Sequence, residues 1–458
     1  MTTVVVGAGL AGLVCARSLA AGGEDVRVLE RSDRPGGVVR TEHREGFLLE
    51  LGPNTVRPTP ELLAIVRDLG LESEMLFSSP RLPRYIDWNG ALHALPSSGL
   101  ALARTRLLSR AGKMRLLREP FVRRAALASP PESVRAFFTR RMGPEVADRF
   151  IAPFVSGVFA GDPGRLSASD AFPTLARGER RHGSLLATAI AAVRGRGRSV
   201  RRSGPRGLLS FRSGLETLPR ALAASLGDRL VAGTSVESIS PERGGWAVQS
   251  SSGTMRADRV ILACAAGESA RFVREFDTEA AVALSSIPYP PVAVMHFSWR
   301  AEALRAPLAG FGHLVVPAPG HRVLGAVWSS SLFPGRAPEG QTLVTAFAGG
   351  ATDPASARLS DEDLETIAAR ELSETLGATS PPRLVALTRW PRAIPQYEIG
   401  HAHRMGVLAR AEARWPGLVF LGAYRGGISV GDVVKNALAV PRADRAETPP
   451  PELMGRLR

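Results

Sequence analysis

The sequence is poor in the residues on which several common kinds of site depend. Only two cysteines are present, Cys15 and Cys264, and both lie in apolar runs without a CxxC pair, which argues against a disulfide framework and fits a reducing compartment. The one close histidine pair, His401 and His403, is interpreted as structural, so we expect no metal site. No uncharged apolar stretch approaches the roughly 20 residues that a membrane-spanning helix needs.

Lysine is almost absent as well. Of the 58 basic residues only Lys113 and Lys435 are lysines, and the formal net charge is +15. Phosphate-binding surfaces often mix both cations, so this skew indicates a chain-wide bias, and no recognition motif for nucleic acid is present. We expect no nucleic-acid partner. The 458 residues, 44% hydrophobic and 22% charged, have the composition of a folded protein with roughly three domains.

The N-terminal residues have the pattern of a strand, a glycine turn, a helix and a second strand. An apolar strand at residues 3–6 is followed by a helical run to residue 21 and by a strand that ends at Glu30. The turn between the first strand and the helix consists of Gly7, Ala8, Gly9, Leu10, Ala11 and Gly12. GxGxxG alone is a weak signal, but in this context, with an acid 18 residues after Gly12, it predicts a dinucleotide site.

Each glycine of this turn has a physical reason. Gly7 permits the tight turn, Gly9 lets the backbone approach a diphosphate at the helix N-terminus, and Gly12 allows close packing of helix on strand. Glu30 would accept hydrogen bonds from the ribose hydroxyls. The plainer alternative is a glycine-rich turn of an α/β domain without a ligand.

Two further loops have backbone suited to lie close to a ligand. One runs from Arg31 to Gly36 and Gly37, and the other comprises Gly52, Pro53, Asn54 and Thr55. An ordinary turn explains either loop taken alone.

Two stretches carry the positive charge. Residues 100–150 are helical in pattern, with twelve Arg or Lys against four acids, and residues 177–206 hold nine arginines against one acid. Apolar pairs such as Leu116-Leu117 and Phe121-Val122 stand among these arginines, a composition that suits anionic lipid headgroups, although a solvated helix face explains it equally well. Residues 195–207 have no apolar face and are predicted to form a surface loop.

The remaining chain alternates short strands with helices, which indicates a mixed sheet. Strands are expected at residues 230–239, 246–250, 254–256, 260–263, 292–299, 312–316, 323–328, 343–347 and 417–422, and helices at 215–226, 361–376 and 432–440. The last strand and helix flank a glycine-containing turn at residues 424–431, so the chain closes much as it opens.

These motifs together resemble a known family, the FAD-dependent protoporphyrinogen and coproporphyrinogen oxidases within the flavin amine oxidase superfamily. The resemblance runs from residue 4 to about residue 440. Its more specific marks are Gly52-Pro53-Asn54, Pro83-Arg84-Tyr85, His93-Ala-Leu-Pro96, Ser156-Gly-Val-Phe-Ala-Gly161, Gly310-Phe-Gly-His-Leu314 and Ile394-Pro-Gln-Tyr397. The sequence departs from the family at Cys264-Ala265, where relatives often carry proline, and at Asn54, whose position varies.

The resemblance implies an α/β fold with a discontinuous Rossmann-like FAD-binding domain, a mixed-sheet substrate domain and a helical, membrane-associated subdomain. The FAD domain would comprise residues 1–80, 208–285 and 404–445. The substrate domain would comprise residues 81–96, 182–207 and 286–403, and the helical domain residues 97–181. The late second glycine turn independently favours FAD over a nicotinamide, whose domain would usually continue its strands without interruption.

The resemblance also implies roles for single residues. Val236 would hold the adenine through its backbone, and Ile428, Ser429 and Val430 would lie at the flavin end. Arg84 would pair with a propionate, which suits the two parallel hydrogen bonds of a guanidinium. The residues expected against the macrocycle are Gly157, Phe311, Leu314 and Phe347. The flavin carries the chemistry, and Asn54 is the only candidate for a catalytic side chain.

The implied activity is the six-electron oxidation of protoporphyrinogen IX to protoporphyrin IX in heme biosynthesis, in three two-electron steps that reduce O₂ to H₂O₂. Coproporphyrinogen III oxidation is the nearest alternative, and a carotenoid desaturase or amine oxidase a more distant one. The non-enzyme alternative is a basic protein that binds a membrane surface or nucleic acid. A cytoplasmic location is expected, with peripheral contact to the inner face of the cell membrane as a hypothesis, and a homodimer is left open.

Overall fold

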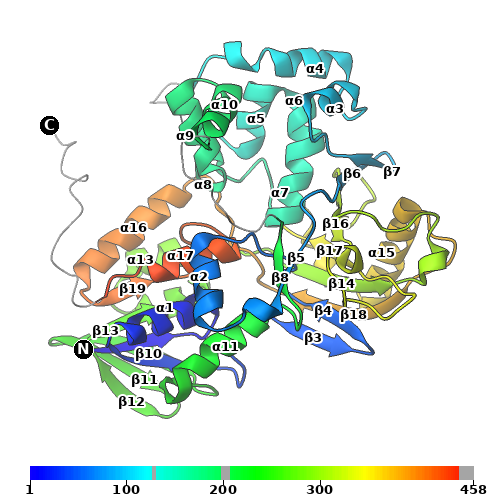
Figure 1. Ribbon diagram of the computed structural model, residues 1–458. Coiled ribbons are helices and arrows are strands. Elements are labelled where there is room, and N and C mark those ends of the chain that lie inside the picture. Colours follow the sequence, from blue (N-terminus) through cyan, green and yellow to red (C-terminus); the bar gives the residue numbers. More distant parts are fainter. Residues whose placement is uncertain (126–129, 197–206, 443–458) are drawn as a thin grey trace.

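The computed structural model describes residues 1–125, 130–196 and 207–442. Figure 1 shows an α/β region around the N-terminus, a second sheet region beside it, and a group of helices above both. Most of the surface loop expected at residues 195–207 lies outside the described residues.

The first region contains a five-stranded parallel sheet of order β19-β13-β1-β2-β9. Its strands are β1 (Thr2–Val6), β2 (Asp25–Leu29), β9 (Leu230–Val231), β13 (Arg259–Leu262) and β19 (Leu418–Phe420). Val4, Val5 and Val6 of the central strand are all buried, because a parallel sheet is covered on both faces. N-terminal, central and C-terminal segments therefore build one sheet.

Helices and a small sheet cover the two faces. On the face of Val5 pack α1 (Leu10–Ala21), α2 (Pro60–Asp68), α11 (Thr217–Leu226) and α17 (Val430–Leu438). On the face of Val4 and Val6 pack α12 (Ala266–Val273), α13 (Thr278–Ser285), α16 (His401–Arg414) and the antiparallel strands β10 (Val236–Glu242), β11 (Gly245–Ser250) and β12 (Gly253–Ala257).

The second region is a mixed seven-stranded sheet of order β18-β14-β17-β16-β15-β6-β7. Its strands are β6 (Arg84–Trp88), β7 (Ala91–Ala94), β14 (Val292–Ser298), β15 (Gly312–Val315), β16 (Val323–Val327), β17 (Val344–Gly349) and β18 (Arg383–Trp390). The helix α15 (Asp361–Leu376) covers one face with Leu364, Ala368 and Leu372. The hairpin of β3 (Thr41–Arg44) and β4 (Phe47–Glu50) packs on the sheet through Phe47 and Leu49, and β5 (Met75–Phe77) pairs with β8 (Leu209–Phe211).

The third region is helical. It contains α3 (Gly99–Arg104), α4 (Arg110–Leu117), η2 (Glu119–Phe121), α5 (Val134–Met142), α6 (Pro144–Val146), η3 (Ala147–Ile151), α7 (Ala152–Phe159), α8 (Ala168–Ala171), α9 (Pro173–His182) and α10 (Leu185–Arg196). Val134, Phe137, Phe138 and Leu166 lie at the centre of its core. Over the described ranges, no helix combines the length and the apolar character needed to cross a membrane.

The structure differs from the sequence analysis in several elements. The strands β6, β7 and β18 and the helix α16 were not expected, and residues 230–239 form two strands in different sheets. Residues 185–196, assigned above to the substrate domain, form α10 and pack on α9 and η2, because Glu119 accepts hydrogen bonds from Ser184 and Leu185. The division into three domains, with residues 182–207 in the substrate domain, stays a prediction.

Candidate functional site

The N-terminal glycine turn connects β1 to α1 and is closed by tight backbone packing. Gly7 has φ of +104°, a conformation that L side chains rarely adopt. A Cβ on Gly12 would lie 2.0 Å from the carbonyl oxygen of Gly7, so only glycine fits there. At Gly9, in contrast, a Cβ would meet no described atom within 4 Å, and no described side chain caps the helix N-terminus that follows. The open side of the turn is therefore at Gly9.

The two further loops converge on this turn. Gly36 pairs with Gly9 in a parallel bridge and donates its N–H to Ala8 O at 2.8 Å, while a Cβ on Gly37 would lie 3.3 Å from the Cα of Gly9. Gly52 lies so close to Val38 that an added Cβ would be 1.9 Å from Val38 O. The second loop therefore packs directly on the first. These contacts bring three glycine segments that are distant in sequence to one place.

The loop at residues 52–55 runs from β4 toward Val56, which exchanges backbone hydrogen bonds with Leu209. Gly52, Pro53, Asn54 and Thr55 are all partly buried. Asn54 donates its side-chain amide to Gly52 O at 3.1 Å, so its amide braces its own loop. The catalytic role considered for Asn54 stays a prediction.

Glu30 stands at the end of β2 beside the glycine turn. Its carboxylate accepts hydrogen bonds from Ala8 N at 2.7 Å and Ser32 N at 2.9 Å, and its backbone carbonyl accepts from Thr234 N. Arg31 is exposed and lies 3.8 Å from Glu268. The acidic residue expected for a ribose is thus held next to the turn expected for a diphosphate.

The predicted adenine residue lies close by, in the small sheet. Val236 is buried at the start of β10, two residues after Thr234, and its carbonyl accepts from the guanidinium of Arg271 at 3.1 Å. Its carbonyl therefore already has a partner within the protein, and its backbone N–H is the group left to test for adenine contact.

The C-terminal turn joins the same assembly. Ser429 caps α17, accepting from Asp432 N at 3.1 Å. Val430 and Leu10 line one small apolar cavity together with residues of α2, α11 and β8. Ile428 is partly buried immediately before the cap. The predicted flavin-end residues thus begin a helix that packs against the helix of the N-terminal turn.

These features fit FAD. The uncapped start of α1 offers N–H groups and a favourable dipole to a diphosphate, Gly9 leaves room in front of them, and Glu30 offers an acceptor next to them. Gly7 to Gly12, Glu30, Gly36, Gly37 and Gly52 would hold the dinucleotide, and residues 428–430 its flavin end.

The five residues expected against the substrate come together at the seven-stranded sheet. Gly312 of β15 is paired with Arg84 of β6, and the Arg84 guanidinium lies 5.1 Å from the centre of the Phe311 ring. Leu314 follows on β15, and a Cβ on Gly157 of α7 would lie 2.3 Å from its Cδ2. The helix α7 therefore rests directly on this face of the sheet.

Phe347 belongs to the same face through strand register. Leu314 is paired with Gly325 on β16, Gly325 with Phe347 on β17, and Phe347 with Val294 on β14. Directly opposite residues in a sheet project to the same side, so these residues form one row. The row lies on the face opposite α15, whose partners are Val315, Ala326 and Ala346.

Gly325 was missed by the sequence analysis. A Cβ on it would approach His313 O at 2.7 Å and the Cδ2 of Leu314 at 3.2 Å, so a side chain would disturb the middle of the row. The available signal was a glycine inside a predicted strand, which often marks close approach of a ligand or of other backbone.

Arg84 supplies the exposed positive charge at this wall. It is solvent-exposed, and none of the ion pairs found among the described residues includes it. His313 on β15 is buried, accepts from Trp328 Nε1 at 3.3 Å, and has its pKa lowered to about 4 by burial, so it is neutral at physiological pH. The row is apolar, α7 packs on it, and Arg84 stands at its edge.

The fold and this site define an FAD-dependent α/β oxidoreductase. Residues 10–440 match the model of the flavin-containing amine oxidoreductase family. The chain is 35% identical to the chloroplastic protoporphyrinogen oxidase of Nicotiana tabacum, over 95% of this chain and 84% of the relative, and 27% identical to the coproporphyrinogen III oxidase of Bacillus subtilis, over 95% and 96%. A crystal structure from Exiguobacterium sp. 255-15 shares the fold with a TM-score of 0.80 at 23% identity, covering 95% of this chain and 97% of that one.

The chain therefore belongs to the family of flavin-containing amine oxidoreductases and, within it, to the protoporphyrinogen oxidase family. This confirms the resemblance predicted from the motifs and the FAD cofactor predicted from the glycine turn. The individual site residues named above stay predictions.

Proposed function

We propose that the protein oxidises protoporphyrinogen IX to protoporphyrin IX, with three O₂ reduced to three H₂O₂ for the six electrons and six hydrogens removed. The observation that carries the proposal is the apolar row of Leu314, Gly325 and Phe347 with Arg84 at its edge. A tetrapyrrole offers a broad apolar face and peripheral carboxylates, which match this wall and this cation. The relative from Nicotiana tabacum bears the name of the same activity.

In this proposal each group of residues has a defined task. Arg84 binds a propionate by two charge-assisted hydrogen bonds and so fixes the rotation of the ring. Phe311, Leu314, Gly325 and Phe347 lie against one face of the macrocycle, and Gly157 lets α7 approach without a side chain in the way. Bound FAD supplies the acceptor for a hydride from a meso carbon.

Incubation with protoporphyrinogen and with coproporphyrinogen, followed by porphyrin fluorescence, tests the substrate. We expect a higher kcat/KM for protoporphyrinogen. A clear preference for coproporphyrinogen would favour the activity named for the Bacillus subtilis relative, because one arginine at the wall does not distinguish two propionates from four. Inactivity on both would favour a carotenoid or an amine.

The cofactor and the acceptor are tested separately. The purified protein should be yellow and release FAD on heating, and turnover in air should form one H₂O₂ for each two electrons removed. Oxidation of the porphyrinogen without O₂ consumption would show that another acceptor replaces O₂.

We also propose that the helical region contacts a membrane surface, with the protein located in the cytoplasm at the inner face of the cell membrane. Exposed apolar side chains gather on α3, α4 and η2, where Leu100 is 61%, Leu117 69% and Phe121 86% exposed. Arginines surround them, as anionic lipid surfaces require.

Flotation with phosphatidylglycerol vesicles tests this contact. Phe121→Asp should lower the bound fraction severalfold, whereas Val282→Asp, at another exposed apolar position (63%) on α13 of the other region, should leave it unchanged. Equal binding by the parent and the Phe121→Asp variant would contradict the proposal. Size-exclusion chromatography of the parent protein without vesicles tests whether it forms a homodimer.

A further inference from the structure

The motif Ile394-Pro-Gln-Tyr397 has no part in the site described so far, yet it lies between the two halves of that site. We propose that Gln396 and Tyr397 are positioning residues that fix the flavin-end turn relative to the substrate wall. The inference rests on the proposed function, because it assumes that residues 428–430 face the flavin and that α7 faces the substrate.

The Tyr397 hydroxyl binds the C-terminal turn at two points. It donates to Ala423 O at 2.6 Å and accepts from Gly427 N at 2.9 Å. The ring is 5% exposed and stacks on His401 with centroids 4.0 Å apart and planes at 11°. One buried side chain thus closes the turn from inside, immediately before the predicted flavin-end residues.

This turn needs such a closure. Gly426 and Gly427 have φ of +76° and +128°, conformations that an unconstrained backbone exchanges readily with others. From the opposite side Asn436 donates to Arg425 O at 2.8 Å, and Arg425 is paired with Glu412. Without the Tyr397 hydroxyl, Ala423 O and Gly427 N would lose the group that joins them across the turn.

Gln396 connects the same segment to α7. Its Nε2 donates to Phe159 O, the last residue of α7, at 2.8 Å, two residues after Gly157. The Tyr397 carbonyl accepts from Ser167 N at 2.8 Å. Because consecutive residues bind the end of α7 and the flavin-end turn, the distance between substrate and flavin depends on them.

The test uses the FAD-loaded enzyme. Tyr397→Phe keeps the ring and its stacking on His401 and removes only the hydroxyl. We expect FAD content and melting temperature near those of the parent, a roughly tenfold lower rate of anaerobic flavin reduction by protoporphyrinogen, an unchanged KM, and an altered visible circular dichroism of the bound flavin. A tenfold lower rate corresponds to about 1.4 kcal/mol in the activation free energy.

Two further variants separate position from stability. Gln396→Leu should slow the same step without altering the flavin spectrum, since it frees α7 and not the turn. Tyr289→Phe, which removes a largely buried hydroxyl that accepts from Ala266 N, should match the parent in rate and spectrum.

Parental rates and spectrum in Tyr397→Phe would overturn the proposal, as would loss of FAD or of folding in both Tyr397→Phe and Gln396→Leu. If the parent itself oxidised neither porphyrinogen, the proposed function would fail. The flavin spectrum of Tyr397→Phe, measured without substrate, would still decide whether Tyr397 positions the turn.

Discussion

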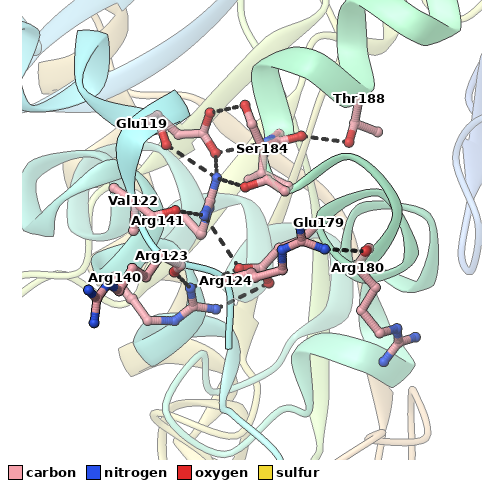
Figure 2. Close-up of polar contacts among 12 residues, drawn as sticks. Glu119, Val122, Arg123, Arg124, Arg140, Arg141, Glu179, Arg180, Ser184 and Thr188 are labelled. Carbon is pink, nitrogen blue, oxygen red and sulfur yellow. Dashed lines mark hydrogen bonds and ion pairs between the residues drawn. The ribbon is translucent and has the colours of Figure 1, made fainter. Parts of the chain in front are cut away.

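Arginines of the helical region and the arginine at the sheet edge occupy opposite surroundings. Arg141 of α5 is completely buried, and Figure 2 shows it between Glu119, Glu179 and Ser184. Arg84 is exposed and contacts an aromatic ring in place of a carboxylate. In a chain that uses arginine almost exclusively as its cation, only the surroundings distinguish a structural arginine from one available to a ligand.

The buried network joins three helical segments. Glu119 of η2 accepts from Arg141, from Ser184 and from the Leu185 N–H at the start of α10. Burial opposes ionisation of Glu119, but these hydrogen bonds outweigh it and hold its pKa below the usual range. Glu179 of α9 binds Arg140 at 2.8 Å beside it. Arg140 and Arg141 are therefore paired with carboxylates inside the protein.

Removing Arg141 should have the largest effect. Arg141→Ala leaves Glu119 buried without its cation, so we expect the free energy of unfolding to fall by about 3 to 5 kcal/mol. Urea denaturation measures this loss. Arg180→Ala, at an exposed position of α9, is the matched control and should stay within about 0.5 kcal/mol of the parent. Similar values for the two variants would contradict the distinction between buried and open arginines.

Arg336 is also buried, but its carboxylate partner, Glu50, is more distant. We expect this pair to make the free energy of unfolding depend on pH. Arg336 lies 3.7 Å from Glu50, and burial raises the pKa of Glu50 to about 7 although the Arg336 charge opposes this shift. The folded state then holds a proton that the unfolded state has lost. The stabilisation from Glu50 is complete below pH 4.5 and disappears as the pH rises through about 7.

Urea denaturation at pH 5 and pH 8 measures this contribution. The parent should lose at most about 3 kcal/mol more than Glu50→Gln between the two values, since the glutamine cannot ionise. Parallel pH profiles for the two proteins would show that Glu50 stays ionised beside Arg336 throughout.

The dinucleotide half of the site could be predicted from the sequence because its constraints are local. Gly7 and Gly12 are five residues apart, and their contact follows from the turn itself. The order of the remaining strands was not predictable: β1 lies between β2 and β13, and the chain between those two strands forms parts of all three regions.

The substrate wall and the buried network depend on distant partners. Leu314, Gly325 and Phe347 form a row only through strand register, and a shift of one residue would turn each to the other face. Glu119 meets Arg141 22 residues away and Leu185 66 residues away. Arg84 could be selected from so many arginines only by its motif.

Replacing Arg84 should have the smallest effect on free energy among these predictions. It also tests the comparison of buried and exposed arginines most directly. Arg84→Ala should lower kcat/KM for protoporphyrinogen roughly 30- to 150-fold, about 2 to 3 kcal/mol of transition-state binding, because the propionate loses its anchor and the ring its orientation. Arg84→Lys should recover only part of the lost kcat/KM, since a point charge cannot form two parallel hydrogen bonds.

Arg81→Ala, at an exposed arginine just before β6, should keep parental kinetics. Unfolding free energy and FAD content should stay parental in all three variants, because an exposed arginine without an ion pair among the described residues contributes little to folding. Parental turnover by Arg84→Ala would mean that another group holds the propionate.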